Sequence, residues 1–448
     1  MSKQQFPGTS AVVVGGGFAG VACAKDLAKR GVQVTLIDKN NYHQFQPLLY
    51  QLATAQLTEG DIARPIRGIV GSLPSVNVKQ AKVTAVDVDA LTVTTAKGQS
   101  HRGDYLVLAM GSQPNFFGTP GAAEHSLPLY TLDDAVALRT RVLEVFEAAD
   151  CNPELIARGA LNFVIIGAGA TGVESAGAMA DLVNRLGPAA YRDLPVGSVK
   201  ITLVDLGHAV LGPFSDKAQE YAQKVLQKDG VQIRLGLGAK EIAEDRVVFN
   251  DGSEILTRTA VWAGGIEAPD LAWASGLPAG PGGRLEVEPD LSVNGHPNLF
   301  VLGDTANIKG GDGTALPQLG SVAQQSGQWA ARNILADLDH TRRTAFHYKD
   351  KGIMAMIGRG TAVAEVGEHR HELHGTFAFA AWLGVHAMLL SGVRQRINAF
   401  VAWGWDYFSR SRTSALLGEN ANHQIDWGDD QPSDQTSGGD TGAQSVAP

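Results

Sequence analysis

The sequence predicts an α/β fold built from two similar units, because one strand–turn–helix–strand pattern occurs twice. Residues 10–40 read SAVVVGGGFAGVACAKDLAKRGVQVTLIDKN: an apolar strand, a Gly-x-Gly-x-x-Gly turn, an Ala-rich helix and a second strand ending in an acid. Residues 161–183, LNFVIIGAGATGVESAGAMADLV, repeat it, and after an insertion the strand VKITLVDLG follows at 199–207. This is the pattern of Rossmann-like dinucleotide-binding domains.

Each glycine of the first unit has a physical task. Gly15 permits the tight turn, Gly17 lets a pyrophosphate approach the helix N-terminus, and Gly20 allows the helix to pack closely on the strand. Asp38 ends the next strand, where its carboxylate can accept hydrogen bonds from an adenosine ribose.

The second unit supplies the equivalent positions, which are Gly167, Gly169, Gly172 and Asp205. A carboxylate at Asp205 favours NADH over NADPH because it repels a 2′-phosphate, although His208 nearby weakens that preference. Two nucleotide sites in one chain indicate electron transfer between two nucleotides.

Two later strands connect the halves. Residues 105–115, YLVLAMGSQPN, contain an apolar strand that ends in a turn at Gly111, and residues 298–307, NLFVLGDTAN, contain one that ends at Gly303 and Asp304. The first unit therefore recruits a strand from far down the chain. We expect a discontinuous first domain at 1–125 and 290–345, a second domain at 126–289, a C-terminal region at 346–418 and a disordered acidic tail at 419–448.

Composition limits the partners and the compartment. The 448 residues carry a formal net charge of −9, which argues against nucleic acid because phosphate binding needs clustered Lys and Arg. Residues 419–448 contain six acids and no Lys or Arg, which is typical of a solvated tail. The N-terminus goes straight into a strand, so we expect no signal peptide. We expect no metal site, and the two cysteines show no CxxC spacing.

These residues resemble the two-dinucleotide flavoprotein reductases, and narrower motifs resemble type II NADH dehydrogenases, the single-subunit NADH:quinone oxidoreductases. The narrower motifs are DKNNYHQFQPLLYQLATAQL at 38–57, TGVESAG at 171–177 and YKDKGIMAMIGRGTAVAEV at 348–366. Disulfide reductases would show CxxxxC after Asp38, and Cys23 and Cys151 do not supply the cysteines of a sulfide:quinone oxidoreductase. The resemblance implies NADH at the second site and FAD at the first, held by Gly15, Gly17, Gly20, Asp38, Gly111, Gly303 and Asp304.

The resemblance also implies C-terminal helices that lie on a membrane. Residues 375–393, GTFAFAAWLGVHAMLLSGV, contain no acid, Lys or Arg, and are at the lower edge of the length that spans a bilayer. Residues 397–412 then place an apolar stripe on one helical face, with Trp403 and Trp405 beside it where a headgroup boundary would suit them. We expect residues 375–412 to bind an anionic membrane surface; a buried helical pair at a homodimer interface is the alternative.

Two residues are candidates for the chemistry. Glu174 follows Gly172, and the resemblance places it beside nicotinamide and flavin, although an acid in the first turn of a helix also simply complements the helix dipole. Gln325 is the remaining amide of a segment that the family usually reads as Ala-Gln-x-Ala-x-Gln, and we expect it to contact the quinone. Gly320 and Ser321 depart from that pattern, which puts the identity of the quinone in doubt.

The resemblance implies an FAD-dependent enzyme that takes a hydride from NADH and passes two electrons to a membrane quinone without pumping protons. We expect it on the cytoplasmic face of the cell membrane as a peripheral protein. One alternative is a soluble NAD(P)H-dependent flavoprotein reductase, or diaphorase, with a protein or small-molecule acceptor. Another is a non-catalytic flavoprotein that senses NADH.

Overall fold

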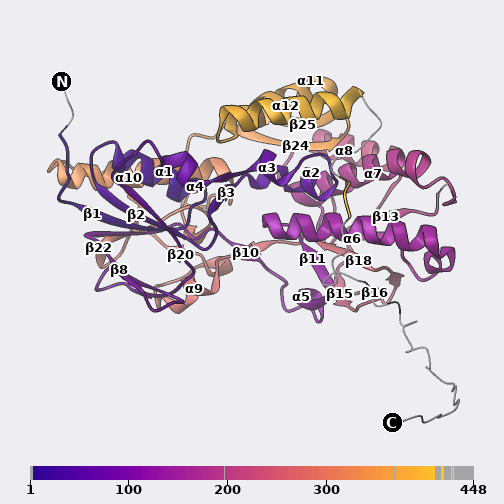
Figure 1. Ribbon diagram of the computed structural model, residues 1–448, viewed down its shortest axis with the longest axis horizontal. Helices are drawn as coiled ribbons and strands as arrows, with labels where there is room; N and C mark the ends of the chain where they lie inside the picture. The colour runs from indigo at the N-terminus through magenta and orange to yellow at the C-terminus, as the bar shows by residue number, and fades with distance from the viewer. Residues whose placement is uncertain are drawn as a thin grey trace, which may run out of the picture.

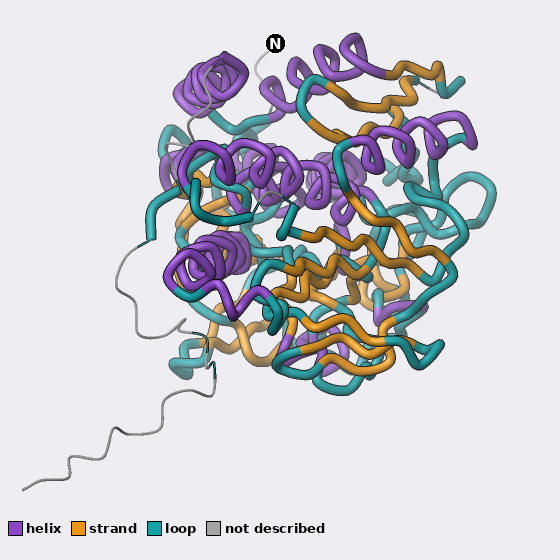
Figure 2. The backbone as a smooth tube through the Cα atoms, turned by 90° about the vertical axis from the view of Figure 1, so that its right-hand side faces the viewer, coloured by secondary structure: helices purple, strands orange, loops and turns teal. Residues whose placement is uncertain are grey.

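A computed structural model describes residues 4–195, 197–367, 369–408, 415–417, 425 and 427. Figure 1 shows two α/β halves side by side, with a pair of C-terminal helices along one edge over their junction. The end-on view in Figure 2 shows most of the long helices above and to the left of the central strands, with a further group of strands at the upper right. The predicted fold class, α/β with C-terminal helices, is confirmed.

The first sheet combines strands from distant parts of the chain. Its central strand, β1, is parallel to β2 on one side and to β9 on the other, with Val12 facing Thr35 and Leu106. Both β1 and β9 are mostly apolar and buried, as parallel strands covered on both faces should be. In order across the sheet, the strands are β21 (Ser292–Val293), β22 (His296–Val301), β9 (Tyr105–Leu108), β1 (Ser10–Val14), β2 (Gln33–Asp38) and β5 (Val76–Gln80), of which only β21 is antiparallel.

The second sheet is parallel throughout and lies within residues 126–262. In order, its strands are β11 (Ser126–Pro128), β18 (Thr259–Trp262), β12 (Asn162–Ile166), β13 (Lys200–Asp205) and β14 (Val231–Leu235). Two antiparallel three-stranded sheets accompany the large ones: β6 (Val83–Asp87), β7 (Thr92–Thr95) and β8 (Ser100–Arg102), and β15 (Ala239–Ile242), β16 (Arg246–Phe249) and β17 (Glu254–Leu256). Short pairs join β3 (Tyr42–Gln44) to β4 (Ala63–Pro65), β10 (Gln113–Pro114) to β19 (Ile266–Glu267), and β20 (Leu285–Glu286) to β23 (Ala306–Asn307).

Close helix packing depends on small residues. In the first half α1 (Phe18–Ala28) packs on α10 (Gly320–Leu338), and a Cβ at Gly327 would collide with the carbonyl of Ala19. The second half has α6 (Leu132–Cys151), α7 (Ala170–Ala190) and α8 (Asp216–Lys228). The shorter helices are α2 (Leu49–Ala53), α3 (Glu59–Ile62), α4 (Ile66–Val70), α5 (Ala122–His125) and α9 (Asp270–Ala274).

The C-terminal region is a three-stranded antiparallel sheet followed by two helices. Its elements are β24 (Gly352–Gly358), β25 (Thr361–Val366), β26 (His371–His374), α11 (Gly375–Leu389) and α12 (Val393–Phe408). Strand β24 lies directly on α7, where a Cβ at Gly177 would collide with the carbonyl of Ile357. None of the helices in the described part of the chain is long and apolar enough to cross a membrane.

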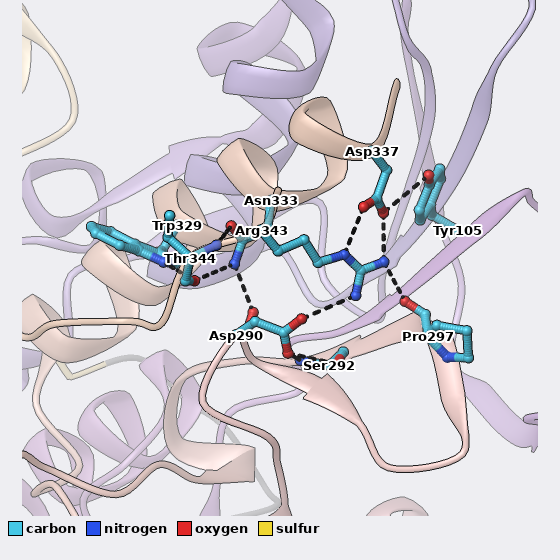
Figure 3. A network of polar contacts seen from close by, with 9 residues as sticks. All are labelled: Tyr105, Asp290, Ser292, Pro297, Trp329, Asn333, Asp337, Arg343 and Thr344. Carbon is cyan, nitrogen blue, oxygen red and sulfur yellow. Dashed lines mark hydrogen bonds and ion pairs between the residues drawn. The ribbon is translucent and has the colours of Figure 1, made fainter. Parts of the chain in front are cut away.

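An ion-pair network fixes the segment after α10 to the first sheet (Figure 3). The guanidinium of Arg343 binds both carboxylate oxygens of Asp337, the shorter contact being 2.5 Å, and one oxygen of Asp290 at 3.2 Å. It also donates to the carbonyl of Pro297 and lies over the ring of Phe300, 5.0 Å from its centroid. The network has a structural role, because it holds this segment at the edge of the first half and none of its residues belongs to a predicted site.

One expectation about the C-terminal end needs correction. Trp403 does not face a headgroup boundary: its side chain is buried, and its Nε1 donates to Gln51 Oε1 at 2.8 Å, so only Trp405 is exposed. Within the predicted disordered tail the structure describes Ile425 and Trp427, and both pack on the protein. The guanidinium groups of Arg158 and Arg258 lie over the Trp427 ring, 5.8 and 5.3 Å from its centroid. Residues 409–414, 418–424, 426 and 428–448 lie outside the described residues.

Candidate functional site

The first glycine turn has the geometry of a dinucleotide site. Gly15 has φ +103°, and a Cβ there would collide with the carbonyl of Ala109, while a Cβ at Gly20 would collide with the carbonyl of Gly15. At Gly17, by contrast, a Cβ would meet no atom within 4 Å, so open space lies at the N-terminus of α1. That helix has no acidic side chain in its first turn and no side-chain cap. The backbone N–H groups there are available to an anion.

Asp38 lies at the same place, at the end of β2. Its carboxylate accepts the N–H of Gly16 at 2.6 Å and that of Asn40 at 2.7 Å. Burial raises the pKa of Asp38, and these two N–H donors offset only part of the effect. Each carboxylate oxygen keeps a further lone pair with which it could accept a ribose hydroxyl.

The turn at Gly111 and the Gly303-Asp304 segment meet beside this site. Thr305 Oγ1 donates to the carbonyl of Gly111 at 2.9 Å, and Ser112 Oγ donates to Asp304 at 3.2 Å. Burial raises the pKa of Asp304, and the Ser112 hydroxyl partly offsets it. The structure thus brings together all seven residues predicted for the first site, whose ligand contacts stay predictions.

The second site repeats the first almost atom for atom. Gly167 has φ +104° and faces the carbonyl of Ala263, whereas Gly169 has open space where a Cβ would be. The carboxylate of Asp205 accepts the N–H of Ala168 at 2.5 Å and that of Gly207 at 2.6 Å. Gly172, like Gly20, packs too closely on its own turn to carry a Cβ. The residues therefore fit two bound dinucleotides.

Glu174 lies on α7 and is partly buried. The helix begins at Ala170 and has no acid in its first turn, so Glu174 lies beyond the position at which an acid would simply complement the helix dipole. Its Oε1 accepts the N–H of Met356 at 3.1 Å. Burial raises the pKa of Glu174 to about 8, and the Met356 amide and Trp382 indole offset part of this by favouring the charged form. A carboxyl group with this pKa holds a proton at neutral pH.

A cavity of about 30 Å³ lies beside Glu174, which is room for one or two water molecules. It is enclosed by α2, α7, β24, α11 and α12, and the residues around it include Gln51, Glu174, Asp181, Met356, Trp403 and Asp406. Glu174 and Asp181 are seven residues apart on α7 and therefore share one helix face. The cavity thus extends from Glu174 to α12.

Charged groups close the far end of this cavity. Arg185 Nε binds Asp181 at 3.0 Å, and its Nη1 binds Asp406 Oδ1 at 3.2 Å and the Asp406 carbonyl at 2.8 Å. Sequence reasoning missed this ion pair and the contact with Met356. The Asp181–Arg185 half was visible as an (i, i+4) pair in the sequence, but nothing local indicated that Asp406 would join it.

The side chain of Gln325, which we expected at the quinone, binds the backbone of Lys349. Its Nε2 donates to the carbonyl of Lys349 at 3.1 Å, and its Oε1 accepts the Lys349 N–H at 3.0 Å. Next to it, Ser321 Oγ and Tyr348 OH are 2.9 Å apart. The geometry gives Gln325 the task of holding the segment that leads into β24, and its contact with a quinone stays a prediction.

Comparison with known proteins agrees with this geometry. The pyridine nucleotide-disulphide oxidoreductase family matches residues 9–327, which defines the class as a reductase with two dinucleotide sites. Two proteins of Mycobacterium tuberculosis are similar over most of their length: type II NADH:quinone oxidoreductase NdhA is 38% identical, covering 90% of this chain and 87% of its own, and type II NADH:quinone oxidoreductase Ndh is 34% identical, covering 92% of each.

A solved structure of NDH2 from Plasmodium falciparum in complex with NADH superposes with a TM-score of 0.83. It covers 90% of this chain and 99% of its own at 19% identity, so it supports the fold alone. The chain belongs to the type II NADH:quinone oxidoreductases, flavoenzymes of the pyridine nucleotide-disulphide oxidoreductase family. The predicted family and the predicted cofactors, FAD and NADH, are thereby confirmed.

Proposed function

We propose that this chain binds FAD at the Gly15–Asp38 site and NADH at the Gly167–Asp205 site, and reduces a quinone beside Glu174. The overall reaction converts NADH, one proton and a quinone into NAD⁺ and a quinol. When bound, FAD supplies the redox chemistry that joins the two substrates. The observation that carries the proposal is the position of Glu174, which belongs to the NADH fingerprint helix and lies on a cavity reaching the C-terminal helices.

The side chains contribute binding, orientation and a proton. Asp38 and Asp205 are placed to hold the two riboses, and the open N-termini of α1 and α7 to hold the pyrophosphates. Glu174 is protonated at neutral pH and can give its proton to a quinone oxygen as that oxygen gains charge. Water in the adjoining cavity can then return a proton to the carboxylate.

We also propose that α11 and α12 hold the enzyme against an anionic membrane at the cytoplasmic face, where NADH is available. Large apolar side chains gather on their outer surface: Phe377, Met388 and Leu389 on α11, and Ile397, Phe400, Val401 and Trp405 on α12, with Val393 at the start of α12. Arg394 and Arg396 lie in the first turn of α12, where each would add about 1 kcal/mol of attraction to anionic lipid. A homodimer that uses the same face is the competing arrangement.

The decisive experiment titrates the purified holoenzyme with NADH and then with a water-soluble quinone, in the presence and absence of anionic vesicles. We expect stoichiometric flavin bleaching by NADH, rapid reoxidation by quinone and salt-sensitive vesicle binding. A holoenzyme that NADH bleaches but no quinone reoxidises would contradict the proposed acceptor. Fast turnover with quinone but no vesicle binding at low salt would favour the soluble diaphorase.

A further inference from the structure

Trp382 connects the outer helices to Glu174. It lies on α11, is fully buried, and stacks on His386 with ring centroids 4.0 Å apart. Its ring meets those of Tyr50 and Trp403 edge-on, at 6.5 and 5.9 Å. Its Nε1 is buried and has no hydrogen-bond partner among the described residues, and the indole lowers the pKa of the Glu174 carboxyl group beside it. A buried indole N–H without an acceptor is costly, so a specific role for it is expected.

Building on the proposed function, we propose that Trp382 is a positioning residue for Glu174, whose indole N–H orients the carboxyl group and sets how readily it releases its proton. Both donors that act on this carboxyl group come from the C-terminal region, the Met356 N–H from β24 and the Trp382 N–H from α11. The acid of the NADH-binding half is therefore completed by the same helix whose outer side carries Phe377 and Met388. Seating of α11 and the state of the acid are thus coupled.

Other titratable groups around Glu174 can be separated from it. Tyr50 on α2 has a pKa well above its usual value because it is buried and lies near Glu174. Burial lowers the pKa of His386 on α11 to about 4. Asp181 and Asp406 are held by Arg185 at the far end of the cavity. Neither Tyr50 nor His386 titrates near pH 8, so a transition there reports on Glu174.

The test compares Trp382→Phe with Trp403→Phe in the holoenzyme. Both changes remove a buried indole N–H from the same helix pair, but Trp403 donates to Gln51 and not to Glu174. The first readout is the pH midpoint of flavin reoxidation by a water-soluble quinone. The second is the pH midpoint of the Glu174 carboxyl band in infrared difference spectra. The Glu174→Gln variant identifies this band, because the band is absent from its spectrum.

Loss of a donor to the charged form disfavours ionisation, so Trp382→Phe should raise both midpoints by about one pH unit. Trp403 also lines the cavity, so the comparison rests on the midpoints and not on the rate: Trp403→Phe should leave both midpoints at the parent's values. Unchanged midpoints in Trp382→Phe, or the same shift in Trp403→Phe, would overturn the positioning role. If Glu174→Gln itself leaves reoxidation and its pH profile unaltered, the proposed role of Glu174 has failed, which is a different result.

A second measurement tests the same inference without a substitution at Trp382. With ¹⁵N-labelled tryptophan, one of the seven indole resonances should titrate with the midpoint of the Glu174 carboxyl band and lose that titration in Glu174→Gln. If no indole resonance follows the carboxyl group, Trp382 does not sense Glu174 and the inference is wrong.

Discussion

The backbone N–H of Met356 donates to Glu174 Oε1 at 3.1 Å, although the two residues lie 182 positions apart in the chain. The contact is possible because Gly177, one turn further along α7, lets β24 approach the helix backbone. The fingerprint helix and the C-terminal sheet therefore form one unit around Glu174. A chain shortened to end at Tyr348 would lose this donor and expose the face of α7 that β24 covers.

Glu174→Gln should separate catalysis from stability. Folding raises the pKa of Glu174 to about 8, so the native state holds the proton more tightly than the unfolded chain does. The stability due to that proton is complete below about pH 4.5 and is lost as the pH rises towards about 8. Glutamine needs no proton, so the variant should be the more stable protein at pH 8, by roughly 2–5 kcal/mol, and nearly equal to the parent at pH 5.

In stopped flow, the same variant should reoxidise its flavin with quinone at least about ten-fold more slowly, because a general acid contributes roughly 10²–10⁴ to such a step. Reduction by NADH should change little. Two results would contradict these roles of Glu174. Reoxidation traces identical to the parent's would rule out the proton donor, and a melting difference that is the same at pH 5 and pH 8 would rule out the pH-dependent stability.

Asp205→Arg should change nucleotide preference and leave flavin content intact. The substitution removes a carboxylate that repels a 2′-phosphate and supplies a guanidinium that can pair with it, so the NADPH/NADH ratio of kcat/KM should rise roughly 100-fold. Asp205 also accepts the N–H groups of Ala168 and Gly207, so NADH use should weaken as well. Asp205→Asn keeps one acceptor oxygen and serves as the control. Loss of flavin from the arginine variant would mean that the two sites are assigned in reverse.

Ile397→Glu with Val401→Glu should release the enzyme from vesicles. The two side chains are 57% and 65% exposed on α12, so their removal should not disturb the core. Losing two apolar contacts with lipid and adding two negative charges should weaken binding to anionic vesicles about 100-fold. A matched control, Lys97→Gln with Gln99→Glu, makes the same change in net charge at the turn before β8, far from α12 in Figure 1. Equal binding by both double variants would show that net charge alone decides the affinity.

Arg343→Met should destabilise the first half without touching the nucleotide sites. The substitution leaves Asp337 and Asp290 without their cation in a partly buried place, which should cost about 2–3 kcal/mol. The comparison is Arg246→Met, which breaks exposed pairs with Asp245 and Glu254 and should leave the melting temperature close to the parent's. If the melting curve of Arg343→Met matches that of Arg246→Met, the network in Figure 3 adds no measurable stability.

Local signals predicted the geometry of the two glycine turns because each turn is local, and the nucleotide contacts of these turns stay predictions. The glycines, the helix N-terminus and the strand-end acid follow one another within about 30 residues, as the pattern requires. The discontinuous first sheet was also predictable, since β22 ends at Val301, just before the Gly303-Asp304 turn, and Thr305 in that turn contacts Gly111. In these places the sequence constrains the backbone directly.

Predictions about side chains whose contacts lie far away in the sequence were less reliable. A helical pattern in residues 397–408 cannot distinguish a tryptophan at a membrane boundary from one buried in the protein. Trp403 is buried, and Gln51, 352 residues away, accepts its indole N–H. Trp427 belongs to the predicted tail, yet the guanidinium groups of Arg158 and Arg258 lie over its ring. Long-range side-chain pairing of this kind leaves no local pattern in the sequence.

Gln325→Leu tests whether this amide acts on the quinone directly or through the backbone that it holds. Gln325 binds the N–H and carbonyl of Lys349, and the chain enters β24 three residues later and reaches Met356. We expect Gln325→Leu to speed hydrogen exchange at the Lys349 amide, lower stability by about 1 kcal/mol and raise the quinone KM two- to five-fold, with NADH reduction unchanged.

The control for that prediction is Ser321→Ala, which breaks the contact with Tyr348 but leaves the Gln325 amide in place. Because Tyr348 and Lys349 belong to the same segment, loosening either one should displace β24 in a similar way. Both variants should therefore raise the quinone KM by similar factors, and the double variant should add little to either single change, as coupled sites do. If Gln325→Leu raises the KM while Ser321→Ala leaves it unaltered, the Gln325 amide contacts the quinone itself, as the family pattern first suggested.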